Sequence, residues 1–148
     1  MNHFVSRLVC VVCAFISLMA FSERAQAAVR PYAASGTAQF TSESEFVGVG
    51  YATYLGRYSE AGVVAFSPTS NPAVLHVDGS IVYTSSNGDE LHAVVTGELN
   101  GLTGAITATV SYAGGTGRFA SASGSASLAG QLGAGGTISV TVAGTIGF

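Results

Sequence analysis

Two histidines could do chemistry near neutral pH, because an imidazole both ligates metals and transfers protons. They are His76 and His92, and a zinc site would need a third ligand, for which Asp78 or Glu90 could be proposed. His92 falls on the polar side of an alternating segment, and His76 is out of phase with its apolar neighbours. We therefore expect both histidines on the surface, and we predict no metal site.

Serine chemistry and phosphate binding are the other possibilities that residue types raise. Serines 121, 123, 125 and 127 alternate as on the outward face of a strand, and no serine sits on a strand-to-helix elbow. The Gly-Gly-Thr-Gly run at 114–117 lacks the following helix that a phosphate loop requires. We predict no catalytic residues and no cofactor, so the interpretation leans away from an enzyme.

The first 27 residues have the pattern of a secretory signal peptide. Arg7 precedes an apolar stretch of 14 residues at 8–21, and Ala25-Gln26-Ala27 follows. A membrane-spanning helix needs about 20 apolar residues, so no stable membrane anchor is expected. We predict cleavage between Ala27 and Ala28, and a domain at 28–148 that is exported to the periplasm or secreted.

The composition of residues 28–148 excludes several functions. Cys10 and Cys13 leave with the signal peptide, so no disulfide remains. Three arginines, no lysine and seven acids give a net charge of −4, which disfavours nucleic acid and a polybasic membrane patch. All 20 glycines lie in this part, and such a density weakens helices. Short strands joined by tight turns are the expected structure.

Alternating apolar and polar residues predict the strands. The pattern is clearest at 90–99, 105–113, 121–132 and 137–148, with earlier strands expected at 36–41, 47–58, 62–67 and 73–85. Turn sequences separate the later strands, beginning with Asn87-Gly88-Asp89. About eight strands with short loops predict an all-β fold, and small inward residues favour an eight-stranded antiparallel barrel over a sandwich.

The segment YAGGTGRFASASG at 112–124 resembles the Gly-Gly-x-Gly-x-Phe turn of plant allene oxide cyclases and dirigent proteins. Segments 50–58 and 86–91 also look like those of bacterial exported proteins with this barrel. The resemblance implies an eight-stranded antiparallel barrel in which the turn joins two strands with its aromatic residue plugged inward. Gly114, Gly115, Gly117 and Phe119 carry over as fold determinants only.

In these families the barrel holds a lipid-like epoxide or phenoxy radicals beside acidic residues. Those acids could not be mapped here, because Glu90 and Glu98 fall on the polar face of their strand. The resemblance therefore implies a barrel without assigning a reaction.

Tyrosines and phenylalanines are the best material for a pocket, because a barrel of eight strands is either packed solid or holds one small ligand. Tyr51 and Tyr58 belong to this aromatic set. The candidate lining residues are Tyr54, Phe66, Tyr83, Val95, Val110, Tyr112, Phe119 and Val140.

Four hypotheses remain open alongside ordinary core packing. They are binding of a small apolar ligand, a cyclase or isomerase acting on a lipid-like substrate, a structural protein, and a small outer-membrane barrel. The terminal Phe148 fits the membrane hypothesis, but eight spanning strands of about 9–11 residues fit poorly into 121 residues, and there is no Trp.

Overall fold

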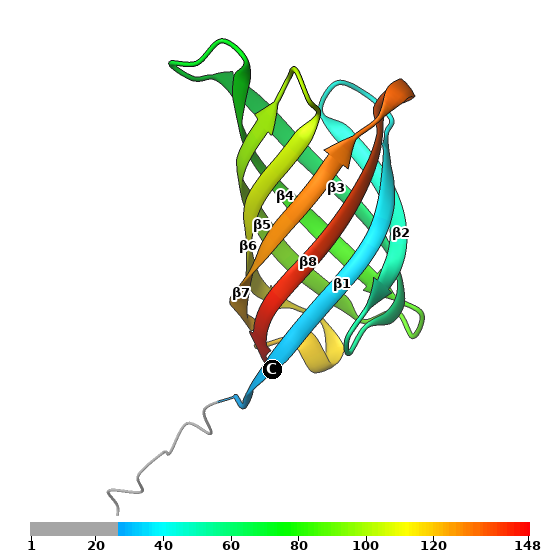
Figure 1. Ribbon diagram of the computed structural model, residues 1–148. Helices are drawn as coiled ribbons and strands as arrows, with labels where there is room; N and C mark the ends of the chain where they lie inside the picture. Colours follow the sequence, from blue (N-terminus) through cyan, green and yellow to red (C-terminus); the bar gives the residue numbers. More distant parts are fainter. Residues whose placement is uncertain (1–26) are drawn as a thin grey trace, which may run out of the picture.

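The computed structural model describes residues 27–148, so the predicted signal peptide lies outside the described residues except for its last position. Eight strands and two short 3-10 helices make up the described chain (Figure 1). Their bounds are β1 Val29–Phe40, β2 Glu45–Ala52, β3 Gly56–Pro68, β4 Val74–Ser85, β5 Glu90–Asn100, β6 Ala105–Gly115, η1 Gly117–Phe119, β7 Ser123–Leu132, η2 Ala134–Gly136 and β8 Thr137–Gly147.

The strands form one closed barrel in which each strand pairs with the next along the chain. β1 also pairs with β8, from Val29 opposite Gly147 to Gln39 opposite Thr137, and every pairing is antiparallel. Closure leaves no strand edge unpaired, which removes the usual site of edge-to-edge aggregation. The prediction of an all-β, eight-stranded antiparallel barrel is confirmed.

Alternation along each strand divides apolar interior from polar exterior. In the second half the inward residues are those that the sequence pattern predicts, and Leu91, Val110 and Ile146 are fully buried. Serines and threonines dominate the outward positions of β6, β7 and β8. No helix within residues 27–148 is long and apolar enough to cross a membrane.

The strand boundaries predicted for the first half are wrong in two places. Residues 47–58 do not form one strand, because the chain reverses between Ala52 and Gly56, and the segment 62–67 is the second half of β3. β1 begins at Val29 rather than at residue 36. The reversal escaped prediction because it contains no Asn-Gly or Gly-Gly pair; Tyr54 itself takes a positive φ of 70°.

Candidate ligand-binding cavity

A cavity of about 80 Å³ lies inside the barrel, where Phe40 at the end of β1 and Phe46 near the start of β2 line it. This end of the barrel lies opposite η1 (Figure 1). The cavity walls come from all strands of the barrel and are almost wholly apolar. The lining residues are Ala38, Phe40, Phe46, Glu60, Val64, Phe66, Val77, Ile81, Tyr83, Val95, Leu99, Ile106, Ala108, Leu128, Leu132, Ile138 and Val140. The barrel is therefore not packed solid.

Three phenylalanines form an aromatic rim at the outer end of this cavity. Phe40 packs against Phe46 with ring centroids 6.1 Å apart, and against Phe66 at 6.2 Å. Phe46 is buried, whereas Phe66 keeps 38% of its surface exposed. Since Phe66 lies near the end of β3, its ring is the side chain of the rim that can most easily move to admit a molecule.

Glu60 is the one ionisable carboxyl group that lines the cavity. It points inward from β3 and is only 6% exposed. Burial raises its pKa to about 7, and burial is the whole cause, because no donor in the described chain offsets it. At neutral pH the carboxyl group is therefore divided between its charged and neutral forms.

Glycines on the neighbouring strands make room for the polar groups inside the barrel. A Cβ atom at Gly48 would lie 2.5 Å from Oε1 of Glu60 and 2.7 Å from the backbone oxygen of Thr37. A Cβ atom at Gly36 would lie 2.6 Å from the Tyr58 hydroxyl. The absence of side chains at these glycines therefore lets Glu60 and Tyr58 lie against β1 and β2.

Four inward tyrosines from four strands accompany Glu60. Tyr58 and Tyr83 pack edge to face with ring centroids 5.3 Å apart, and Tyr32 and Tyr112 do so at 5.1 Å. Burial raises the pKa of all four well above the ordinary value, so they stay neutral. Within residues 27–148 the buried Tyr32 and Tyr112 hydroxyls have no hydrogen-bond partner other than each other. Among these five interior side chains, Glu60 is therefore the one that carries charge near neutral pH.

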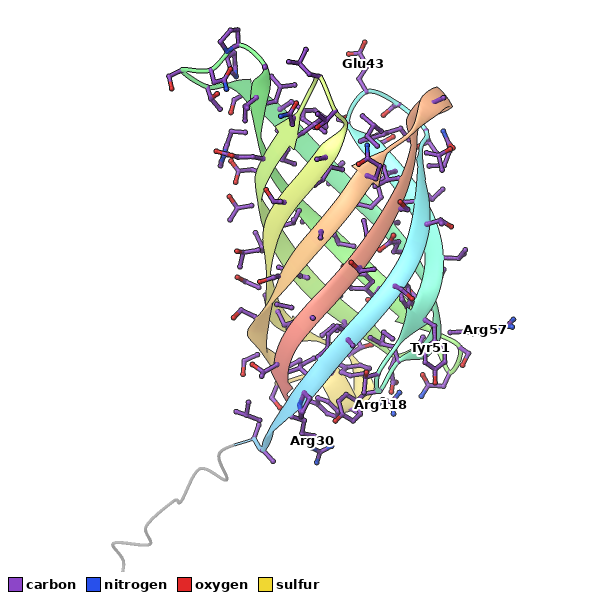
Figure 2. All side chains as sticks on the ribbon, in the orientation of Figure 1. Arg30, Glu43, Tyr51, Arg57 and Arg118 are labelled. Atoms are coloured by element: carbon purple, nitrogen blue, oxygen red, sulfur yellow. The ribbon has the colours of Figure 1, made fainter. Side chains whose placement is uncertain are left out.

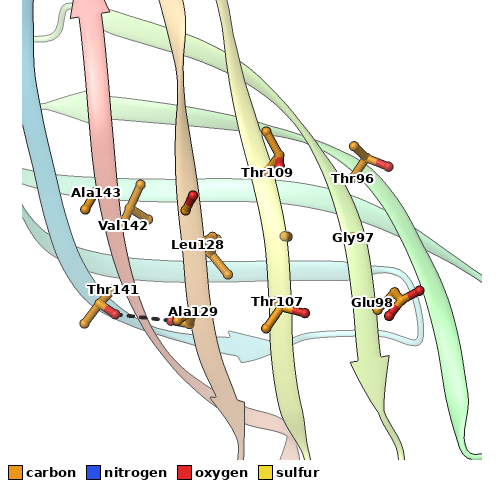
Figure 3. Close-up of a pocket in the computed structure, with 12 residues that line it drawn as sticks. Thr96, Gly97, Glu98, Thr107, Thr109, Leu128, Ala129, Thr141, Val142 and Ala143 are labelled. Carbon is orange, nitrogen blue, oxygen red and sulfur yellow. Dashed lines mark hydrogen bonds between the residues drawn. The ribbon is translucent and has the colours of Figure 1, made fainter.

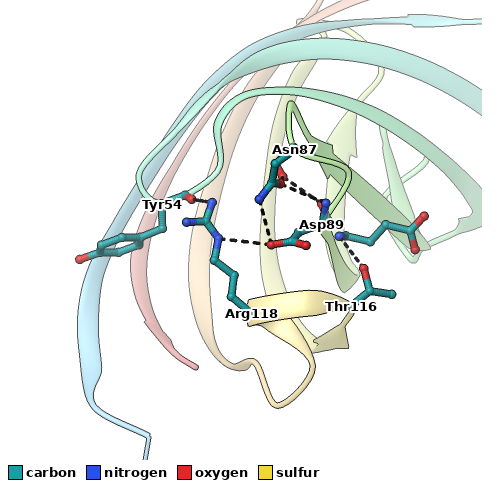
Figure 4. Close-up of polar contacts among 7 residues, drawn as sticks. Tyr54, Asn87, Asp89, Thr116 and Arg118 are labelled. Carbon is teal, nitrogen blue, oxygen red and sulfur yellow. Dashed lines mark hydrogen bonds and ion pairs between the residues drawn. The ribbon is translucent and has the colours of Figure 1, made fainter.

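The opposite end of the barrel is closed by η1 and the adjoining turns (Figure 4). Phe119 of η1 is fully buried and packs on Phe148 with centroids 5.1 Å apart. Arg118 donates a hydrogen bond to the carbonyl oxygen of Tyr54 and lies 3.8 Å from the Asp89 carboxylate. Arg118 thereby connects η1 to the β2–β3 and β4–β5 turns. Because this end is closed, the phenylalanine rim is the way into the cavity.

The chain was compared with known proteins at three levels. No protein-family model matches it, and no match was found among curated proteins or solved structures. The site must therefore be interpreted from its own geometry.

Four of the eight residues predicted to line a pocket do line the cavity: Phe66, Tyr83, Val95 and Val140. Val110, Tyr112 and Phe119 are buried inside the barrel but do not line the cavity.

Tyr54 lies in the turn between β2 and β3, where its ring packs on Phe148 at the closed end. Tyr51, also considered as pocket material, points outward and is 64% exposed (Figure 2).

Glu60 and Tyr32 are the interior polar residues that sequence reasoning missed. The predicted gap between the strands 47–58 and 62–67 placed Glu60 in a turn, and the late predicted start of β1 omitted Tyr32. The alternation of Tyr58, Glu60, Gly62 and Val64 would have placed Glu60 inside, had the strand been recognised as continuous.

The two histidines and their acidic neighbours lie on the outer face of the barrel. His76 pairs with Asp78 at 2.9 Å and His92 with Glu90 at 3.0 Å, in separate surface pairs. Within residues 27–148 no three His, Cys, Asp or Glu side chains are grouped as a metal would require.

A shallow depression over β5 to β8 is lined by short side chains, and Glu98 is its one ionisable lining residue (Figure 3). It exists because threonine, serine and alanine project little from a curved sheet. The side chains that line this depression do not converge on a point where a ligand would be held.

Proposed function

We propose that the barrel is a small-molecule binding protein that takes up a compact, largely apolar ligand through the phenylalanine rim. The observation that carries this proposal is the apolar cavity of about 80 Å³ with one buried carboxyl group in its wall. An engineered cavity of about 150 Å³ is large enough for benzene, so the ligand is small unless Phe66 moves aside.

A titration followed by NMR tests this proposal with 1-butanol as the probe. Saturable shifts of methyl groups around Val64, Ile106 and Val140 are expected. The variant Val140→Phe fills the cavity and should abolish them, whereas Thr141→Phe, which adds the same ring on the exposed outer face of β8, should not. Absence of saturable shifts in the wild type, or equal binding by Val140→Phe, would overturn the proposal.

A second candidate function is catalysis of the cyclase or isomerase type, and the buried carboxyl group of Glu60 in the cavity wall favours it. A carboxyl group with a pKa of about 7 is suited to general acid–base catalysis at neutral pH. The buried Tyr83 hydroxyl beside the same cavity could donate a hydrogen bond to a developing oxyanion. Glu60→Gln would then abolish turnover of a bound substrate while leaving its binding intact, and an unchanged rate would refute the enzyme.

We also propose that the barrel is related to allene oxide cyclases and dirigent proteins. The glycine-rich run 114–117 leads from β6 into η1, which precedes β7, and Phe119 is buried there. A closed eight-stranded barrel supports this kinship.

We further propose that the barrel is exported and faces water. A chain beginning at Ala28 would retain all eight strands, since β1 begins at Val29. The outward serines and threonines of β6 to β8 support an aqueous setting, because a barrel that spans a membrane carries an apolar outer band. N-terminal sequencing of the protein from a bacterial periplasm should begin at Ala28; an intact Met1, or a protein that requires detergent, would contradict this.

A further inference from the structure

The Glu60 carboxylate inside the barrel has no positively charged side chain beside it in the described chain. The arginines of residues 27–148 are Arg30, Arg57 and Arg118, and all three lie at the closed end, away from the cavity (Figure 2). The titratable groups that interact with Glu60 are Tyr32 from β1, Tyr58 from β3 and Tyr83 from β4. Tyr112 from β6 lies beyond them, against Tyr32. A buried carboxylate without a cation is costly, so a ligand that brings a positive charge removes that cost.

The open end of the barrel also favours a cation. Glu43 and Glu45 lie in and beside the β1–β2 connection at this end, opposite the arginines (Figure 2). The rim consists of the rings of Phe40, Phe46 and Phe66, and aromatic rings attract cations as these lose water. A cation would therefore be drawn toward the mouth and would meet no like charge on its way to Glu60.

The size and shape of the cavity limit the rest of the ligand. About 80 Å³ of mostly apolar space accommodates a chain of a few carbon atoms. The absence of a side chain at Gly48 lets the Glu60 carboxyl group lie against the backbone of β2. A primary ammonium has three donors, which suits one carboxylate and further acceptors in the wall, to which Tyr83 also belongs.

We propose that the cavity binds a short-chain primary alkylamine as its ammonium ion, with the ammonium on the Glu60 carboxylate and the alkyl chain toward the phenylalanine rim. This inference rests on the proposed ligand-binding function and names its ligand class. A charge-assisted hydrogen bond in a dry site should give the amine about 10- to 100-fold tighter binding than a neutral molecule of the same size.

The test compares n-butylamine, 1-butanol and butyric acid by calorimetry between pH 5.5 and pH 8.5. At pH 8 the amine should bind at least about tenfold more tightly than the alcohol. Its affinity should fall by up to about tenfold per pH unit below pH 7, as Glu60 takes up a proton, while that of the alcohol stays constant. Binding near pH 7 should release a fraction of a proton, seen as a heat that depends on the buffer.

Two variants separate this inference from the proposed function. Glu60→Gln should lose the preference for the amine and keep the binding of 1-butanol, whereas Glu98→Gln on the outer face of β5 should behave as the wild type. Equal binding of amine and alcohol by the wild type, a preference that survives in Glu60→Gln, or tightest binding of butyric acid at low pH would overturn the amine assignment alone. Failure of every probe to bind would overturn the proposed function with it.

Discussion

Replacing Glu60 by glutamine should change how the stability of the barrel depends on pH. The carboxyl group has a pKa of 4.5 in a solvated chain and about 7 in the folded barrel, because burial disfavours its charge. Between these two values the folded state holds a proton that the unfolded state has released. The free energy of unfolding therefore falls as pH rises through this window, and the contribution of Glu60 is fully present only below about pH 4.5.

The magnitude follows from the difference between the two pKa values. Each unit corresponds to 1.36 kcal/mol, so the wild type should lose about 3 kcal/mol of stability from this group between pH 4.5 and pH 8.5. This is a large share of the roughly 5–15 kcal/mol that stabilises a typical domain. Glutamine cannot ionise, so the stability of Glu60→Gln relative to the wild type should rise by about the same amount over this range.

Urea unfolding at several pH values, followed by circular dichroism, measures the effect. The useful quantity is the change with pH of the difference between variant and wild type, because the cost of burying the amide itself is constant and cancels. Glu98→Gln, exposed on β5, serves as the control and should show no such trend. Wild-type and Glu60→Gln stabilities that run parallel within about 0.5 kcal/mol from pH 4.5 to pH 8.5 would refute the reasoning.

Three further substitutions test the packing. Phe119→Ala, at a fully buried residue, should lower the free energy of unfolding by about 3–5 kcal/mol in urea titrations; a loss below 1 kcal/mol would show that η1 does not seal the barrel. Tyr32→Phe removes a buried hydroxyl whose one polar neighbour in the described chain is the Tyr112 hydroxyl, so the temperature of thermal unfolding should change little, and a marked loss would show a strong hydrogen bond between the two tyrosines. Gly48→Ala should cost about 1–3 kcal/mol in the same assay, because the new methyl group meets the Thr37 backbone oxygen, whereas Gly101→Ala meets nothing closer than 3.5 Å and should be tolerated.

Much of the second half of the barrel is predictable from local pattern. Inward residues from Leu91 to Ile146 follow strict alternation, and the turn at Asn87-Gly88 has the residues that a positive φ requires; Gly88 has a φ of 89°. The turn at Tyr54 is not predictable in this way. Its left-handed backbone accompanies a hydrogen bond from Arg118, a residue 64 positions away, so no local pattern could indicate it.

Residue type and strand periodicity suffice to assign the inward faces and turns of the second half, and composition alone shows the absence of lysine, which leaves the interior acid without a nearby ammonium group. Those properties are local, because each depends on residue type and on the two-residue period of a strand. The burial of Glu60, its surroundings of tyrosines from three strands and the apolar cavity beside it follow only from the three-dimensional arrangement. These depend on barrel closure, since the register between strands sets which side chains meet and how much space they leave unfilled.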